Sequence, residues 1–159
     1  MYKVLNINNK EYKLEYSIEA SLYGECTEKV VGIMSKLAGV QEGGEEAVQN
    51  LIKSIADIPQ TTIVMFYAGL LEHHGESGDN TVMSIADAKA LIKDYIKSTE
   101  DGNFYDVLTM CINQMAEDGF FELIGLTKMF QAEEKKATKK PTDHQKKQTK
   151  VTSIKATKN

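Results

Sequence analysis

Residues 2–16 have the sequence YKVLNINNKEYKLEY, which predicts a β-hairpin and decides how the fold begins. The first strand carries the apolar residues Tyr2, Val4, Leu5 and Ile7. Asn8-Asn9 supplies the turn, because Asn tolerates a positive φ better than most residues. Tyr12, Leu14 and Tyr16 then alternate with polar residues, so they share one face of the second strand. Since an isolated hairpin is marginal in water, this face must pack on the helices that follow.

The next residues predict two short helices. Ser17 is a suitable N-cap, and Glu19 lies in the first turn, where the helix dipole favours an acid. Ile18 and Leu22 are four residues apart and form the apolar edge of the first helix, which Gly24 interrupts. Thr27 can cap the second helix, which ends at the sequence QEGG of residues 41–44. The buried side of that helix is predicted to consist of Val30, Val31, Ile33, Met34 and Leu37.

A longer apolar pattern follows in the middle of the chain. Residues 45–58 predict an amphipathic helix. Its apolar positions are Val48, Leu51, Ile52, Ile55 and Ala56. Pro59 stops or offsets that helix, because proline has no N–H and clashes with the preceding turn. Residues 61–73 are apolar on all sides in their middle, which predicts the central and most buried helix.

Two more helices have clear start signals. Ser84 and Asp87 form an S-x-x-D cap, and the turn Asp101-Gly102-Asn103 leads into the second of the two helices. Their apolar faces carry Ile85, Ala88, Leu91, Ile92, Tyr95 and Ile96, and then Phe104, Val107, Leu108, Cys111, Ile112 and Met115. Gly119 separates a last segment. The fold class is therefore mainly α (α+β), with an N-terminal hairpin packed on about five to six short helices.

The charges divide the chain into an acidic body and a basic tail. Residues 1–130 contain 10 lysines and 20 acidic residues, a net of −10, whereas residues 131–159 contain nine lysines and three acidic residues, a net of +6. Residues 1–130 are therefore predicted to form a single globular domain. The tail has only Val151 and Ile154 as large apolar residues, so it should be disordered beyond about residue 136.

Nothing in the sequence predicts export or a membrane span. The longest apolar run, residues 63–71, has nine residues, whereas a membrane helix needs about 20. The first residues lack the apolar run of a secretory signal. Cys26 and Cys111 are far apart and form no CxxC motif, which favours free buried thiols over a disulfide. We expect a cytoplasmic protein.

Motifs for catalysis, metals or cofactors are absent from the sequence. His73 and His74 are adjacent, so on a helix they point about 100° apart and do not form an i, i+4 metal pair. Cys111 lies on an apolar helical stripe and has no positioned base nearby in sequence. The acidic QEGG segment lacks the GK[ST] ending of a phosphate loop. We expect no catalytic residue, no metal ligand, no cofactor and no enzyme activity.

Two segments are candidates for binding a partner. The first is an apolar strip, residues 120–130, whose large apolar residues are Phe120, Phe121, Leu123, Ile124, Leu126, Met129 and Phe130. It is either a last helix that closes the core or an exposed surface for self-association or for a helical partner. The second is the tail, which is either a solubilising extension or an electrostatic contact for an acidic partner or nucleic acid. All 19 basic residues are lysine, and the tail has no aromatic residue, which weakens the nucleic-acid interpretation.

The order of these parts resembles a known family. A hairpin over Tyr2–Leu14 runs through Tyr16-Ser17-Ile18-Glu19-Ala20 into helices, and a body of about 130 residues ends in a lysine-rich extension. This layout resembles the tail assembly chaperones of long-tailed bacteriophages and their prophages, most closely over residues 1–37. The match is one of layout, so no functional residue of the family is carried over to this chain.

The resemblance implies a cytoplasmic, non-structural protein of virion assembly. Such chaperones bind the long, largely helical tape-measure protein, keep it soluble, and recruit tail-tube subunits during tail morphogenesis. The resemblance also implies a longer form made by ribosomal frameshifting, for which Lys135-Lys136 or Lys139-Lys140 offers a suitable codon context. The alternative from the residues alone is a small nucleic-acid-associated or regulatory protein that uses its basic tail.

Overall fold

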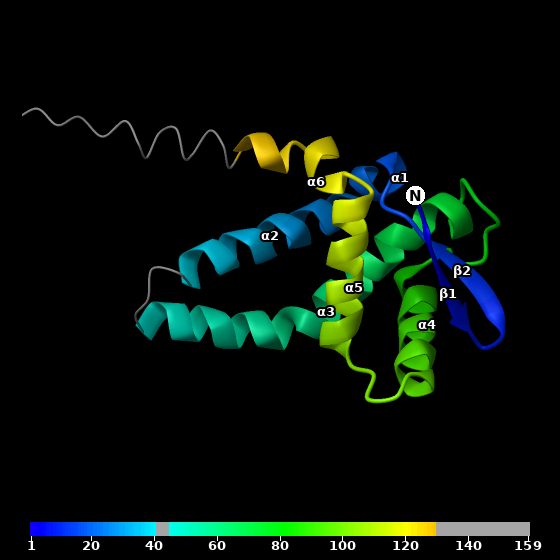
Figure 1. Cartoon of the computed structure of the whole chain (residues 1–159), viewed down its shortest axis with the longest axis horizontal. Helices are drawn as coiled ribbons and strands as arrows, with labels where there is room; N and C mark the ends of the chain where they lie inside the picture. Colours follow the sequence, from blue (N-terminus) through cyan, green and yellow to red (C-terminus); the bar gives the residue numbers. More distant parts are fainter. Residues whose placement is uncertain (41–44, 130–159) are drawn as a thin grey trace, which may run out of the picture.

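The computed structural model describes residues 1–40 and 45–129, which form two strands and six helices (Figure 1). The predicted fold class is confirmed, since a two-stranded antiparallel hairpin packs on helices. The predictions for the break at residues 41–44, for Phe130 and for the tail concern residues outside those ranges. The predicted apolar positions Leu37, Val48, Leu51 and Ile52 lie outside the residues whose side chains are described.

The hairpin consists of β1 (Lys3–Ile7) and β2 (Lys10–Leu14), paired so that Leu5 lies opposite Tyr12. Asn8 and Asn9 both have positive φ, 52° and 63°, which is the signature of the tight hairpin turn that the sequence predicted. The inward face is buried against the helices and consists of Leu5, Ile7, Tyr12 and Leu14, continued by Tyr16. The alternation of residues in β2 was therefore a reliable guide to its buried face.

Three helices follow the hairpin: α1 (Ile18–Leu22), α2 (Gly24–Val40) and α3 (Glu45–His74). The α2 helix begins three residues before the predicted cap Thr27, which instead lies inside it. The α2 helix and the first half of α3 lie side by side and project from the body (Figure 1). Cys26 and Val30 anchor the base of α2 in the core.

The sequence predicted that Pro59 stops or offsets the helix. It does not stop the helix, and α3 continues through Pro59. Proline leaves the carbonyl of Ile55 without its usual N–H donor, but the Ile55 side chain is 58% exposed, so this turn lies at the surface, where water can replace the donor. Thr62 donates its hydroxyl to the Ile58 carbonyl at 2.7 Å, which adds a bond across the same turn. Packing against α2 then holds the two halves in one helix.

The second half of α3 is the centre of the molecule, as predicted from its apolar composition. It is surrounded by β2, α1, α2, α4 and α5. Its buried residues are Thr61, Thr62, Ile63, Val64, Met65, Phe66, Ala68 and Leu70. Most other elements are positioned by their contact with this helix.

The remaining helices are α4 (Ile85–Ser98), α5 (Phe104–Glu117) and α6 (Phe120–Leu123). The predicted cap of α4 is confirmed, because the Ser84 hydroxyl accepts the Asp87 N–H at 3.2 Å. Asn103 caps α5 by accepting the Asp106 N–H at 3.0 Å. Gly119 and Gly125 have φ of 69° and 77°, so left-handed residues flank α6 and separate it from α5 and from a helical turn at residues 126–129.

Candidate interaction surface

The apolar strip at residues 120–129 is divided between the core and the surface. Phe120 is fully buried and Leu126 is 4% exposed, whereas Phe121 and Ile124 pack against the core while remaining partly exposed. Leu123 and Met129 are 49% and 57% exposed. The segment therefore closes the core with some residues and presents others to solvent.

The α1 helix adds two exposed apolar side chains beside α6. Ile18 and Leu22 are 64% and 73% exposed, so the apolar edge predicted for α1 faces solvent, and Ala20 is the buried residue. In this five-residue helix Ala20 is the residue that faces the core. The four-residue spacing of Ile18 and Leu22 places them on one edge of the helix, but it does not show whether that edge faces the core or solvent. The α1 and α6 helices contact each other, so these exposed residues and Leu123 lie on adjoining helices (Figure 1). We define Ile18, Leu22 and Leu123 as the α1/α6 surface.

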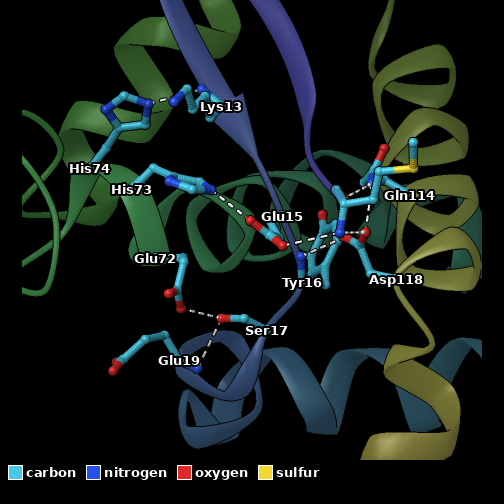
Figure 2. A network of polar contacts seen from close by, with 11 residues as sticks. Lys13, Glu15, Tyr16, Ser17, Glu19, Glu72, His73, His74, Gln114 and Asp118 are labelled. Carbon is cyan, nitrogen blue, oxygen red and sulfur yellow. Dashed lines mark hydrogen bonds and ion pairs between the residues drawn. The ribbon is translucent and has the colours of Figure 1, made fainter.

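The orientation of α1 is fixed by the three residues before it. The Glu15 N–H donates to the Gly69 carbonyl at 2.8 Å, and the Tyr16 N–H donates to Asp118 Oδ2 at 2.8 Å. The Ser17 hydroxyl donates to Glu72 and accepts the Glu19 N–H, which makes it the predicted cap of α1 (Figure 2). This corner is therefore bonded to α3 and to the end of α5, and α1 cannot rotate to bury Ile18 without breaking these bonds.

The chain's amino group belongs to the same polar network (Figure 2). The Met1 ammonium lies 3.1 Å from Glu15 Oε1 and 3.2 Å from Asp118 Oδ1. The buried Gln114 side chain donates to the Met1 carbonyl at 2.8 Å and to Asp118 at 2.9 Å. Hydrogen bonds to Glu15 and Asp118 raise the pKa of the Met1 amine above its ordinary value of 8.0. Sequence reasoning missed this network, because its partners are far apart in the chain.

The two adjacent histidines diverge and bind the hairpin to α3. His73 Nε2 lies 2.6 Å from Glu15 Oε2, at the side of the corner described above. His74 is buried, and its Nε2 accepts the Lys13 N–H at 2.9 Å, so its proton must be on Nδ1, 3.1 Å from Asp79. His73 thus contacts the hairpin end through Nε2, and both ring nitrogens of His74 have intramolecular partners. The expected divergence on the helix is confirmed.

The two cysteines are free and buried, as predicted. Burial raises the pKa of Cys26 and of Cys111 to about 12, so both thiols stay protonated at neutral pH. Among residues 1–40 and 45–129 there is no group of three His, Cys, Asp or Glu side chains that could hold a metal ion.

Several acidic residues lie on or next to the helices at this end of the molecule. They are Glu19 on α1, Glu25 and Glu28 on the first turns of α2, Glu76 after α3, and Glu122 on α6. We define these five residues as the acidic rim. Lys29 on α2 and Lys128 after α6 share these elements, whereas six of the 10 lysines in residues 1–130 lie on the hairpin and α4, where Lys89, Lys93 and Lys97 are exposed at four-residue steps. Asn8 donates to Asp94 at 2.8 Å and ties these two elements together.

A recess beside the α1/α6 surface has the same acidic character. It has a volume of ≈ 230 Å³ and is bordered by Glu19, Tyr67, Glu76 and Met83. Ligand pockets usually have about 300–1,000 Å³, so this recess is better suited to one side chain of a partner than to a cofactor. Burial, followed by the charges of Asp87 and Glu76, raises the pKa of Tyr67, which keeps the phenol neutral at the recess wall.

Comparisons with known proteins found no matching family model, no matching curated protein and no matching solved structure. Within the described part of the chain, every helix is too short or too polar to span a bilayer. What the geometry offers is exposed apolar side chains on two short adjoining helices, the first of which is held in place by the hydrogen bonds of residues 15–17 (Figure 2).

Proposed function

We propose that the protein is a tail assembly chaperone of a long-tailed bacteriophage or prophage. In this role it binds the tape-measure protein and helps to recruit tail-tube subunits during tail morphogenesis. One observation carries the proposal: Ile18, Leu22 and Leu123 are exposed on adjoining helices, and the bonds at residues 15–17 hold α1 in the orientation that exposes Ile18 and Leu22. The hairpin that runs directly into helices supports it, because this layout carries the family resemblance.

The proposed partner requires a surface of this kind. A tape-measure protein is a long, largely helical chain, and an amphipathic helix exposes an apolar stripe that aggregates unless it is covered. Apolar side chains on α1 and α6 can cover part of such a stripe, as in other helix-in-groove complexes. The net charge of −10 on residues 1–130 would keep the complex soluble.

The test is co-expression of the full chain with the tape-measure protein encoded beside it. We expect the tape-measure protein to move into the soluble fraction and to co-purify with the chain. The double variant Leu22→Ser, Leu123→Ser should lose this effect, whereas Tyr105→Ser should keep it, because Tyr105 is 64% exposed but lies on α5. If the wild-type chain neither solubilises nor retains the tape-measure protein, the proposal is wrong.

The basic tail supports a second candidate, a nucleic-acid-associated or regulatory protein. Nine lysines in residues 131–159 could neutralise phosphates, and the affinity would then fall steeply with salt. This candidate predicts DNA or RNA binding that disappears when residues 131–159 are deleted. It is the weaker of the two, because bidentate base recognition usually relies on Arg and this chain has none.

A further inference from the structure

The charges of the chain are separated in space as well as along the sequence. The acidic rim lies on or next to α1, α6 and the first turns of α2, where Lys29 and Lys128 are the lysines, whereas the hairpin and α4 carry six of the 10 lysines of the body. The last described residue, Met129, follows α6 by six residues. A segment with a net charge of +6 therefore continues from α6 in a chain whose residues 1–130 have a net charge of −10.

We propose that residues 131–159 dock on the α1/α6 surface of their own chain. The two large apolar residues of this segment, Val151 and Ile154, are three positions apart and are flanked by Lys150 and Lys155. This pattern complements the α1/α6 surface, where exposed apolar side chains share their helices with carboxylates such as Glu19 and Glu122. In the proposed contact the apolar pair covers Ile18 and Leu22, while the lysines face the acidic rim. The inference is independent of the identity of the external partner.

The length of the segment allows this contact easily. Val151 lies 22 residues beyond Met129. The largest distance that this many residues can span is about 70–80 Å. Since α1 contacts α6, the target lies well within that range. Tethering also gives an effective concentration in the millimolar range, so that a weak contact is populated in single molecules.

Charge favours this occupant and this site over the other pairings. The α4 helix carries Lys89, Lys93 and Lys97 against Asp87 and Asp94, whereas the acidic rim has five carboxylates against Lys29 and Lys128 on the same segments, so a lysine-rich segment is attracted more strongly by the rim. A second copy would have to compete at micromolar concentration with a segment that is already attached. The consequence is that residues 131–159 shield the exposed Ile18 and Leu22 until a tighter-binding partner displaces them.

Paramagnetic relaxation enhancement on the full chain tests the proposal. A nitroxide is attached at Ser153→Cys, between Val151 and Ile154, while the buried Cys26 and Cys111 should react slowly, and wild type treated with the same reagent controls for them. We expect the label to broaden the amide signals of α1 and α6 and to leave those of α4 unchanged. The broadening should disappear at ~1 M salt, where the Debye length falls to about 3 Å.

Two further samples make the result decisive. The variant Ile18→Ser, Leu22→Ser should lose most of the broadening at low salt, whereas the matched Tyr105→Ser variant should retain it. Uniform broadening, absence of broadening, or broadening centred on α4 would overturn the proposal. So would broadening of isotope-labelled wild type mixed with unlabelled, spin-labelled chains, because that result would show docking on a second copy. A tape-measure pull-down can succeed or fail without affecting any of these outcomes.

Discussion

The contact between β2 and α3 and the α1/α6 surface use apolar residues in opposite ways. At the first, Leu14 and Tyr16 lie so close to α3 that no side chain larger than a hydrogen atom fits at Gly69. At the second, Ile18, Leu22 and Leu123 remain 49–73% exposed, although they are as apolar as the residues of the core. Only one residue, Ser17, separates Tyr16 from Ile18. The polar corner at Glu15–Ser17 is therefore what separates a stabilising region from a region left available for contact.

The largest expected difference in the free energy of unfolding is between two variants of α6. Phe120→Ala removes a fully buried ring that packs 5.6 Å from the Tyr16 ring, so it should lower the free energy of unfolding by about 3–5 kcal/mol. Leu123→Ala, three residues later, should change it by less than about 0.5 kcal/mol, because Leu123 is half exposed. Urea denaturation followed by circular dichroism measures both. Equal losses would show that Leu123 belongs to the core and would remove it from the α1/α6 surface.

Two glycines provide the next comparison. A Cβ at Gly69 would lie 2.5 Å from Leu14 Cδ1 and 3.0 Å from Tyr16 Cζ, and both side chains are buried and cannot move away. Gly69→Ala should therefore lower the free energy of unfolding by about 1–3 kcal/mol. Gly32, inside α2, has open space around its Cβ position, so Gly32→Ala should raise that free energy by about 0.5–1 kcal/mol.

A lower free energy of unfolding in Gly69→Ala and a higher one in Gly32→Ala would sharpen the comparison. The same urea experiment applies, and hydrogen exchange at Glu15, whose N–H donates to the Gly69 carbonyl, reports on the contact directly. We expect faster exchange there in Gly69→Ala and unchanged exchange in Gly32→Ala. If Gly69→Ala were as stable as wild type, β2 would lie less tightly on α3 than the structure indicates.

Local chemistry explains which parts of the fold the sequence predicted well. The Asn8-Asn9 turn, the Ser17 and Ser84 caps and the alternation in β2 each depend on residues a few positions apart, and all are present in the structure. The apolar segment at residues 61–73 was also identified correctly as the central helix, because a helix that is apolar on all sides has to be surrounded by other elements.

Contacts between distant residues explain what the sequence did not predict. Tyr16 and Asp118 are 102 positions apart, and His73 and Glu15 are 58 apart, so no local pattern links them. The continuous α3 depends on packing with α2 that offsets the effect of Pro59. The spacing of Ile18 and Leu22 predicted one apolar edge but not the direction in which it points, because long-range bonds set that direction. The sequence therefore identified Leu123 as a candidate for binding a partner, but that Ile18 and Leu22 also face solvent required the structure.

The polar corner predicts a smaller effect that depends on pH. The pKa of the Met1 amine is raised, so its stabilising contribution is complete below about pH 8 and is lost as the pH rises through the higher folded-state value. Burial alone would raise the pKa of Glu15, but hydrogen bonds with His73 and Met1 outweigh it and lower the pKa below 4.5. The contribution of Glu15 is thus complete above its unfolded-state pKa and is lost as the pH falls through the lower, folded-state one.

Urea denaturation across this pH range measures both sides of the curve. We expect a plateau of stability between about pH 5 and pH 8, with a decline on either side. Glu15→Gln removes one of the two carboxylates that bind the Met1 amine and the one that binds His73. The variant should therefore have a shallower decline at both ends than wild type. Identical slopes in the two proteins would mean that the corner does not couple folding to protonation.

The smallest expected effect on stability is the one most informative about function. Leu22→Ser replaces a side chain that is 73% exposed, so the free energy of unfolding should change by less than about 0.5 kcal/mol. Binding of the tape-measure protein should nevertheless weaken, because the serine leaves a polar hydroxyl facing the apolar stripe of the partner. Tyr105→Ser, at a comparably exposed position on α5, is the matched control for a general loss of apolar surface. Weaker binding in Leu22→Ser alone would show that Leu22 contributes to partner binding and not to the stability of the fold. Equal weakening in both variants would instead assign the interaction to apolar surface in general, and the comparison between the two regions would then have no functional meaning.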